Sequence, residues 1–447
     1  MMKTNRVIWV AAFLLLLLVV LIPNTLMASS GGVPLIAGIR PEFIVFALTL
    51  VGVAIFHDHT MYVALGGLVV LLILKYSMAP GFDFIEHIAG SASEKGEWST
   101  LLNLAGLLFG FAVLANMFEK SNIPEIIPNV LPNDWKGGLV LLALIMVLSS
   151  FLDNIAAALI GGTIAQVVFR HKLHIGYLAA IIAASNAGGA GSVVGDTTTT
   201  LMWIDGVDPI LVVHAFVASI AGFLIYGVIA SRQQQKFQPI LAHKPEGVKP
   251  DFMRLLIVLL ILVGAILTNA LLNFPALGVW IAILVSVFIR KFPVEAMKKA
   301  IPGTIFLVSL VTCASLMPVD ELPAASWQTA FSLGFVSSVF DNIPLTKLCL
   351  EQGGYDWGIL AYTVGFGGSM IWFGSSAGVA LSGIFPEIRS VGKYLQKGWH
   401  VTLAYIISFF IMLWIVGWHP ATPHKPPKAS EVESNAGDFA TSNSNSQ

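Results

Sequence analysis

Charged residues are scarce in this sequence of 447 residues: they make up 11% of it, whereas soluble proteins contain roughly a quarter. Hydrophobic residues make up 56%, and the mean hydropathy is +0.82. A chain with so few charges has too little polar surface for an ordinary soluble fold. The composition therefore predicts a membrane protein with several spanning helices.

Excess charge of either sign is also lacking, because 24 Lys and Arg residues face 25 Asp and Glu residues. Without a basic excess the chain lacks the electrostatic attraction that nucleic acid requires, so nucleic acid is excluded as its main partner.

The two cysteines, Cys313 and Cys349, lie in apolar segments, which excludes a disulfide framework and a thiolate metal site. No phosphate-binding loop of the Walker type occurs, so a transporter of this sequence would use an ion gradient or run downhill. No cofactor is expected.

Long apolar runs are the main positive feature of the sequence. A helix needs about 20 apolar residues to cross a hydrocarbon core of roughly 30 Å. By this criterion the predicted spans are 7–28, 41–56, 60–76, 99–119, 208–230, 253–273, 275–290, 301–318 and 399–418. Polar residues interrupt four further apolar segments, at 138–169, 176–204, 325–351 and 356–385.

The interrupted segments suggest a topology. If 138–169 and 325–351 are hairpins that enter and leave on one side, and 176–204 and 356–385 are broken helices that cross, most of the 24 Lys and Arg residues fall on one side. Short cytoplasmic loops are enriched in these residues. The predicted fold is an all-α polytopic membrane protein with two inverted-topology repeats, each with a re-entrant helical hairpin and a broken transmembrane helix.

This topology divides the chain into five parts. Residues 1–40 are predicted to be an N-terminal anchor or signal peptide with a linker, and the poor small-x-small pattern favours a retained anchor. Residues 41–230 form repeat 1, and residues 231–252 form a basic cytoplasmic linker. Residues 253–419 form repeat 2, and 420–447 form a disordered tail poor in large apolar residues. The expected location is the plasma membrane, which in bacteria is the inner membrane.

Two pairs of matching motifs support the repeat. Residues 149–155 read SSFLDNI and residues 337–343 read SSVFDNI. Further along each half, glycines predicted to break the crossing helices recur with the same spacing: Gly188, Gly189 and Gly195 in the first half, and Gly367, Gly368 and Gly374 in the second. Inverted repeats with broken helices that meet near the bilayer midplane are typical of secondary transporters.

Acidic residues at the interruptions are the candidate functional groups. The first hairpin arm is long enough to carry Asp153 about 22 Å into the membrane. A carboxylate at that depth costs at least about 2.5–3.5 kcal/mol, so it usually pairs with a cation, a proton or another charge. The alternative is that Asp153 and Asp341 only cap the second helix of each hairpin. Asn154 and Asn342 beside them could cap without this cost, so the acids suggest ion binding.

A further carboxylate, Asp196, precedes a run of threonines at 197–200. Hard monovalent cations prefer oxygen ligands, which carboxylates, amides, hydroxyls and unwound backbone supply. The alternative for the threonines is hydrogen bonding to carbonyl groups of their own helix. The predicted ion and proton site comprises Asp153, Asn154, Asp196, Thr197, Thr198, Thr199, Asp341, Asn342, Thr346, Ser375 and Ser376, with no metal beyond the transported cation.

One cation, Lys347, lies six residues after Asp341 in the second hairpin. It could reach the polar pocket as a counter-charge that is released when a cation binds. The favoured alternative is that its ammonium group extends to the outer interface of the membrane, as long basic side chains near helix ends do.

At these residues the sequence resembles the NhaD-type sodium/proton antiporters, which share a superfamily with citrate, dicarboxylate and arsenite carriers. The resemblance covers most of 41–418 and depends on the segments 186–189, 195–203, 341–345, 367–369 and 374–380. It implies an antiporter of sodium, or lithium, and protons that works by alternating access in a lipid bilayer, and it leaves a homodimer open. The chain has alanines at 156–158, where the family usually has threonines, and Gly191-Ser192-Val193-Val194 in place of the family's Trp-Ser-Pro.

Two other functions compete with cation/proton antiport. A carboxylate or other anion carrier coupled to sodium would need a fixed cation, or paired Ser-Asn-Thr motifs, at both hairpin tips, where this chain has acids. An intramembrane aspartyl protease would use two of Asp153, Asp196 and Asp341 to activate water. It has no use for inverted symmetry and glycine-rich breaks in both halves, so the chain is not expected to be an enzyme.

Overall fold

The structure is a computed structural model that describes residues 35, 39–56, 59–79, 81–90, 96–126, 128, 131–240 and 248–421. All of the elements assigned within these residues are helices. The predicted N-terminal span 7–28 and nearly all of the predicted tail 420–447 lie outside the described residues, as does 241–247 of the predicted basic linker.

The helices follow one another with short connections. Their bounds are α2 Pro41–Ile55, α3 Thr60–Met78, α4 Phe84–Ala89, α5 Trp98–Glu119, α6 Ile123–Ile126, α7 Trp135–Ser149, α8 Asn154–Val168, α9 Ile175–Ala190, α10 Thr197–Ile204, α11 Pro209–Val213, α12 Ala215–Phe237, α13 Phe252–Leu272, α14 Pro275–Ser286, α15 Val294–Ser315, η3 Val319–Glu321, α16 Trp327–Ser337, α17 Asn342–Gln352, α18 Trp357–Gly367, α19 Ser376–Ile384, η4 Pro386–Arg389, α20 Val391–Lys397 and α21 Trp399–Ile415.

Several of these helices are long and apolar enough to cross a membrane. In the described part of the chain they are α3, α5, α13, α15 and the span formed by α11 together with α12. The bent pair α20 and α21 also qualifies if it counts as one span. The protein is therefore a multi-pass membrane protein, as its composition predicts. The helices at two predicted spans are shorter than expected, because α2 has 15 residues and α14 has 12.

Each of the four interrupted segments is divided into two helices where polar residues and glycines were expected to break it. The non-helical connections are 150–153, 191–196, 338–341 and 368–375. Gly195 and Gly374 lie within these connections, whereas Gly188 and Gly189 lie in the last turn of α9. The breaks in helical structure are thus confirmed.

Aspartates begin many of the helices. Asp83, Asp134, Asp208, Asp251 and Asp356 are the N-cap residues of α4, α7, α11, α13 and α18, and each side chain accepts a hydrogen bond from a main-chain amide of the first turn. Such caps satisfy amide groups that have no partner within the helix. They fix where these helices start.

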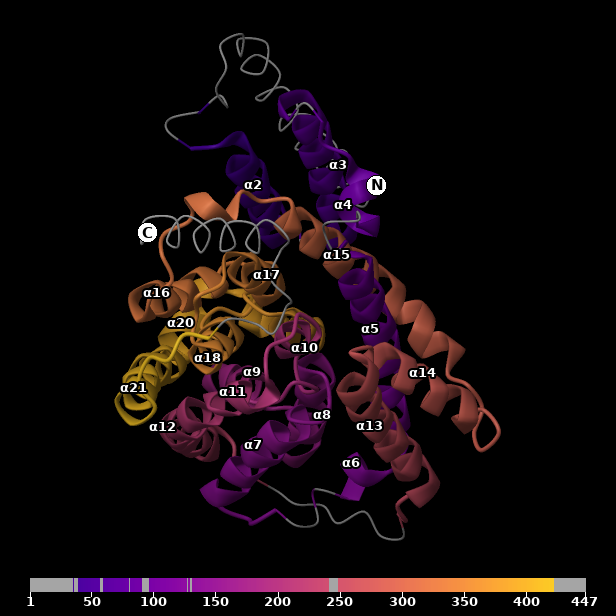
Figure 1. Cartoon of the computed structure of the whole chain (residues 1–447). Helices are drawn as coiled ribbons and strands as arrows, with labels where there is room; N and C mark the ends of the chain where they lie inside the picture. Colours follow the sequence, from indigo (N-terminus) through magenta and orange to yellow (C-terminus); the bar gives the residue numbers. More distant parts are fainter. Residues whose placement is uncertain are drawn as a thin grey trace, which may run out of the picture.

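The helices pack in two groups (Figure 1). The first group contains α2, α3 and α5 from the first half of the chain, with α13, α14 and α15 from the second. The second group contains α7 to α12 and α16 to α21, with α9 in contact with α7, α8, α12 and α18. Every residue of α9 from Gly176 to Ala190 is buried. The first group touches the second where α15 packs on α17 and α5 packs on α10.

Large apolar side chains remain exposed on the outside of the protein. On α13 they include Leu259, Val263 and Ile266, spaced by three or four residues so that they share one face. An apolar face of this kind suits hydrocarbon, because lipid chains are as apolar as the side chains themselves.

Candidate functional site

The three candidate acids are all N-cap residues of the helices that follow the breaks. Asp153 caps α8, Asp196 caps α10 and Asp341 caps α17. In each case carboxylate oxygen Oδ1 accepts a hydrogen bond from the amide two residues further on, at 2.7, 3.5 and 3.1 Å respectively. The capping alternative is therefore correct as a description of their local structure. It leaves their charges unexplained, because Asn would cap equally well.

Asp196 lies at the centre of contacts that join the two halves of the chain. Asn154 Nδ2 donates to Asp196 Oδ1 at 3.2 Å, and Asn342 Nδ2 donates to Asp196 Oδ2 at 3.2 Å. The Asp196 side chain is buried, as are both asparagines. The N-termini of α8, α10 and α17 therefore meet at one carboxylate, and we call this arrangement the Asp196 site.

The hydrogen bonds extend beyond the predicted residues. Asn154 Nδ2 also donates to Asn186 Oδ1 at 3.1 Å, and Asn186 Nδ2 donates to Ser369 Oγ at 2.9 Å. Both Asn186 and Ser369 are fully buried. The sequence analysis placed them in motifs shared with a known family but not in the predicted site. A polar residue in an otherwise apolar, glycine-rich stretch is the signal that could have identified them.

The other two acids adjoin the Asp196 site, because Asp153 and Asp341 directly precede the asparagines that donate to Asp196. Asp341 Oδ2 accepts a hydrogen bond from Ser376 Oγ at 3.0 Å, and Ser375 caps α19 by accepting from Gly378 N at 3.3 Å. Within the described residues, none of the three acids forms an ion pair with lysine or arginine. Grouped carboxylates without a fixed cation attract protons or mobile cations.

The threonines after Asp196 are largely held by main-chain carbonyls. Thr199 Oγ1 lies 3.0 Å from Asp196 O and 2.6 Å from Ser192 O, and Thr200 Oγ1 donates to Asp196 O at 2.8 Å. The back-bonding alternative thus describes these two residues. Thr346 forms a similar bond to Asn342 O at 2.9 Å. A hydroxyl that donates its proton keeps lone pairs for a cation, so these bonds are compatible with ion binding.

The two halves hold their breaks in the same way. Ser149 Oγ, at the end of α7, donates to Ser185 O at 2.5 Å, and Ser337 Oγ, at the end of α16, donates to Val364 O at 2.6 Å. Each acceptor lies three residues before the first glycine of the repeated glycine motif. The same bond at matching positions fixes the end of α7 to α9 and the end of α16 to α18.

Lys347 pairs with two glutamates and with none of the three candidate acids. Its side chain is fully buried, and its ammonium Nζ lies 2.9 Å from Glu97 Oε2 and 2.5 Å from Glu351 Oε1. The ammonium group is therefore held at the start of α5, where the predicted topology places the outer interface of the membrane, and it does not act as a counter-charge to the three acids. Glu97 directly precedes α5, so this ion pair joins the first packing group to α17.

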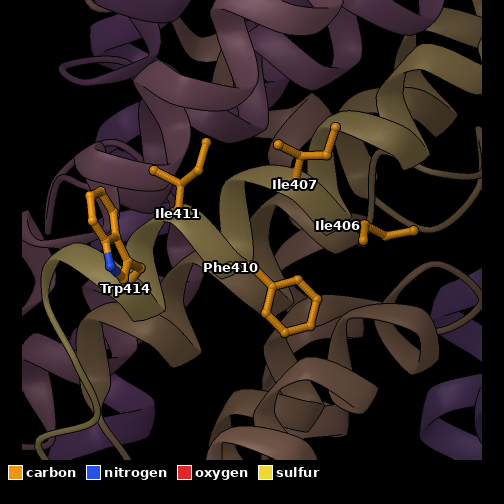
Figure 2. Close-up of a pocket in the computed structure, with 5 residues that line it drawn as sticks. All are labelled: Ile406, Ile407, Phe410, Ile411 and Trp414. Atoms are coloured by element: carbon orange, nitrogen blue, oxygen red, sulfur yellow. The ribbon is translucent and has the colours of Figure 1, made fainter.

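The structure also contains apolar hollows that cannot be ion sites. Figure 2 shows one on the outside of α21, lined by Ile406, Ile407, Phe410, Ile411 and Trp414. It offers no oxygen ligand, and Trp414 is 84% exposed. Among the described residues, no cluster of three or more His, Cys, Asp and Glu side chains forms a site for a resident metal ion.

Known proteins resemble this chain at moderate identity. No family model matches it. The Na(+)/H(+) antiporter NhaD of Alkalimonas amylolytica is 26% identical over 294 residues, which are 53% of this chain and 60% of the relative. The NhaD of Vibrio cholerae is 25% identical over 60% of this chain and 67% of its own length. Sodium/proton antiporter 1 of Arabidopsis thaliana is 26% identical over 58% and 53%.

These comparisons confirm the resemblance to NhaD-type sodium/proton antiporters. The chain spans 60% of the length of the Alkalimonas protein. The names of these relatives describe transporters rather than enzymes, and they favour neither a carboxylate carrier nor a protease.

Proposed function

We propose that the protein is a secondary active transporter that exchanges sodium, or lithium, for protons across a membrane by alternating access. The observation that carries this proposal is the Asp196 site, where amides from two hairpins hold one buried carboxylate with Asp153 and Asp341 nearby. The similar proteins are named as sodium/proton antiporters, which supports it.

The chemistry follows from the charge of the site. A carboxylate that carries a proton is neutral and binds sodium weakly, whereas the ionised form is an oxygen ligand for the ion. Protons and sodium therefore compete for the same group. If the site faces each side of the membrane in turn and changes face only when it is occupied, this competition produces exchange.

We assign the cation ligands to oxygen atoms at the four breaks. They come from Asp153, Asn154, Asp196, Thr197, Thr198, Thr199, Asp341, Asn342, Thr346, Ser375 and Ser376. The arrangement is asymmetric, because the first half contributes Asp196 and the second half contributes Ser375 at the matching position. The Thr198 hydroxyl is buried and forms none of the carbonyl bonds that hold Thr199 and Thr200.

The proposal includes two inverted repeats, 41–230 and 253–419, with a cytoplasmic linker at 231–252 and re-entrant hairpins at the breaks. The matching serine bonds of α7 and α16 support it. The packing supports it as well, since α2, α3 and α5 join their counterparts α13, α14 and α15. We propose in addition that the side with most of the Lys and Arg residues in this topology faces the cytoplasm, and that in a bacterium the protein lies in the inner membrane.

An anion carrier is disfavoured by the same contacts. A carboxylate substrate would need a fixed positive charge at the site, and the Asp196 site has three acids and no lysine or arginine paired with them among the described residues. Lys347 is held by Glu97 and Glu351 instead.

Everted membrane vesicles test the proposed function. A pH gradient is imposed, and its collapse is followed with a pH-sensitive dye after addition of Na⁺, Li⁺, K⁺ or citrate. The proposal predicts collapse by Na⁺ or Li⁺ in vesicles with the parent protein and none in vesicles with Asp196→Asn at matched expression. Collapse by citrate but not by sodium salts of inert anions would contradict it.

A further inference from the structure

A cavity of about 550 Å³ runs beside α8. Its lining from α8 consists of Ala156, Leu159, Ile160, Thr163, Ile164 and Val167. These positions are spaced by three or four residues, so they form one stripe along the helix. The stripe covers most of α8 and is about 16 Å long at 1.5 Å per residue.

The inner end of this cavity, which we call the α8 cavity, lies next to the Asp196 site. Ala156 lines it, and Asp153 is one helical turn earlier on the same stripe. Asp153 is partly exposed, whereas Asp196 is buried. Asn154, which follows Asp153, donates to Asp196 Oδ1. Asp153 does not itself line the cavity, which therefore ends one helical turn from this partly exposed residue.

The end of the cavity away from the Asp196 site carries two further carboxylates. Glu119, the last residue of α5, and Glu125 of α6 both line the cavity and are both exposed. In Figure 1, α6 lies beside the lower end of α8, and the two helices are in contact. A carboxylate facing hydrocarbon is costly, so two of them indicate that water reaches this end.

We propose that the α8 cavity is the water-filled route by which the cation and protons reach Asp153, and that Glu119 and Glu125 concentrate cations at its mouth. The proposal rests on the proposed function and adds to it an entry route and two residues outside the ion site. Carboxylates at the mouth of an apolar-walled cavity raise the local cation concentration, because low-dielectric walls focus their field.

Cations are present at the same end of α8. Lys120, Arg170 and Lys172 are exposed, but none of them lines the cavity. The field inside the cavity should therefore follow the sign of its own lining. The sign of this field can be measured by comparing how fast a cationic and an anionic thiol reagent react with a cysteine placed in the cavity.

Two alanines of α8 provide a matched pair for the experiment. Ala156 lines the cavity, and Ala158, two residues later, is fully buried. Ala156→Cys and Ala158→Cys proteins in lipid nanodiscs are treated with a cationic or an anionic water-soluble methanethiosulfonate. Unmodified protein gives the background, since the native Cys313 and Cys349 are buried.

The proposal predicts rapid labelling of Ala156→Cys and background labelling of Ala158→Cys. Relative to their rates with a free thiol in solution, the cationic reagent should react at least about threefold faster than the anionic one. Adding Glu119→Gln and Glu125→Gln should abolish this preference. An unreactive Ala156→Cys, as expected if lipid or packing fills the cavity, would overturn the route, and a preference for the anionic reagent would overturn the role of the glutamates.

Exchange measurements then separate this proposal from the proposed function. In everted vesicles at low ionic strength, the double glutamine variant should need about two to five times more Na⁺ for half-maximal exchange, with an unchanged maximal rate, and the difference should shrink in high salt. No difference at low ionic strength would contradict the role of the glutamates. Labelling as predicted in a protein without any cation/proton exchange would refute the proposed function while the cavity stays open to water.

Discussion

Two glycines beside the Asp196 site leave no room for a side chain, and alanine there should disrupt the site. A Cβ atom at Gly195 would lie 2.2 Å from Ser149 O, and one at Gly374 would lie 2.4 Å from Ser338 O. Ordinary contacts of this kind begin at 3.4 Å. The break would therefore have to move about 1 Å away from the hairpin, and overpacking of this kind typically costs about 1–3 kcal/mol.

The chain offers matched controls for this substitution. At Gly303 in α15 and Gly383 in α19, an added Cβ atom would have no neighbouring atom within 4 Å. Alanine at these helical positions should be neutral or stabilising by up to about 1 kcal/mol, because alanine has the higher helix propensity.

The measurements are the melting temperature in detergent and sodium-dependent exchange in vesicles at matched amounts of protein. We expect Gly195→Ala and Gly374→Ala to melt a few degrees lower than the parent and to lose most of their exchange. Gly303→Ala and Gly383→Ala should melt at or above the parent temperature. A Gly195→Ala protein that melts and exchanges like the parent would refute the close packing of the connection 191–196 against the end of α7.

Three further predictions concern charge and coordination. Asp153→Asn, Asp196→Asn and Asp341→Asn should fold, because asparagine also caps helices, and should lose or greatly reduce sodium-dependent proton movement in vesicles; normal exchange in all three would remove the carboxylates from the mechanism. Ala156→Thr adds a hydroxyl ligand that should strengthen Na⁺ binding by on the order of 1–2 kcal/mol, so the half-saturating Na⁺ concentration should fall about tenfold. An unchanged concentration would mean that Asp153 is not a direct ligand of the ion. Lys347→Met leaves two carboxylates without their cation and should cost about 3 kcal/mol of stability, so a parental melting temperature would contradict a structural ion pair.

Local chemistry made the breaks predictable from sequence. Glycine, serine and aspartate interrupt apolar runs at 150–153, 191–196, 338–341 and 368–375, and each interruption separates two helices. The short helices α4 and α20 were not predicted, because they are only 6 and 7 residues long. Helices of that length are set by tertiary contacts rather than by a periodic pattern.

Long-range partners were not predictable. Lys347 is buried because Glu97 lies against it, and the two residues are 250 positions apart. Asn186 and Ser369 meet from different halves of the chain, 183 positions apart. A single sequence identifies which residue types are costly to bury, but it does not identify which other residue will compensate for that cost.

The central claim is that sodium and protons compete for Asp196. The direct test is to titrate purified protein with Na⁺ in weakly buffered detergent solution and to count the protons released for each sodium bound. If sodium and protons compete, the parent protein releases protons as sodium binds, whereas the Asp196→Asn protein, shown to be folded by its melting temperature, releases none. Sodium binding to the parent without proton release, or equal release from Asp196→Asn, would contradict it.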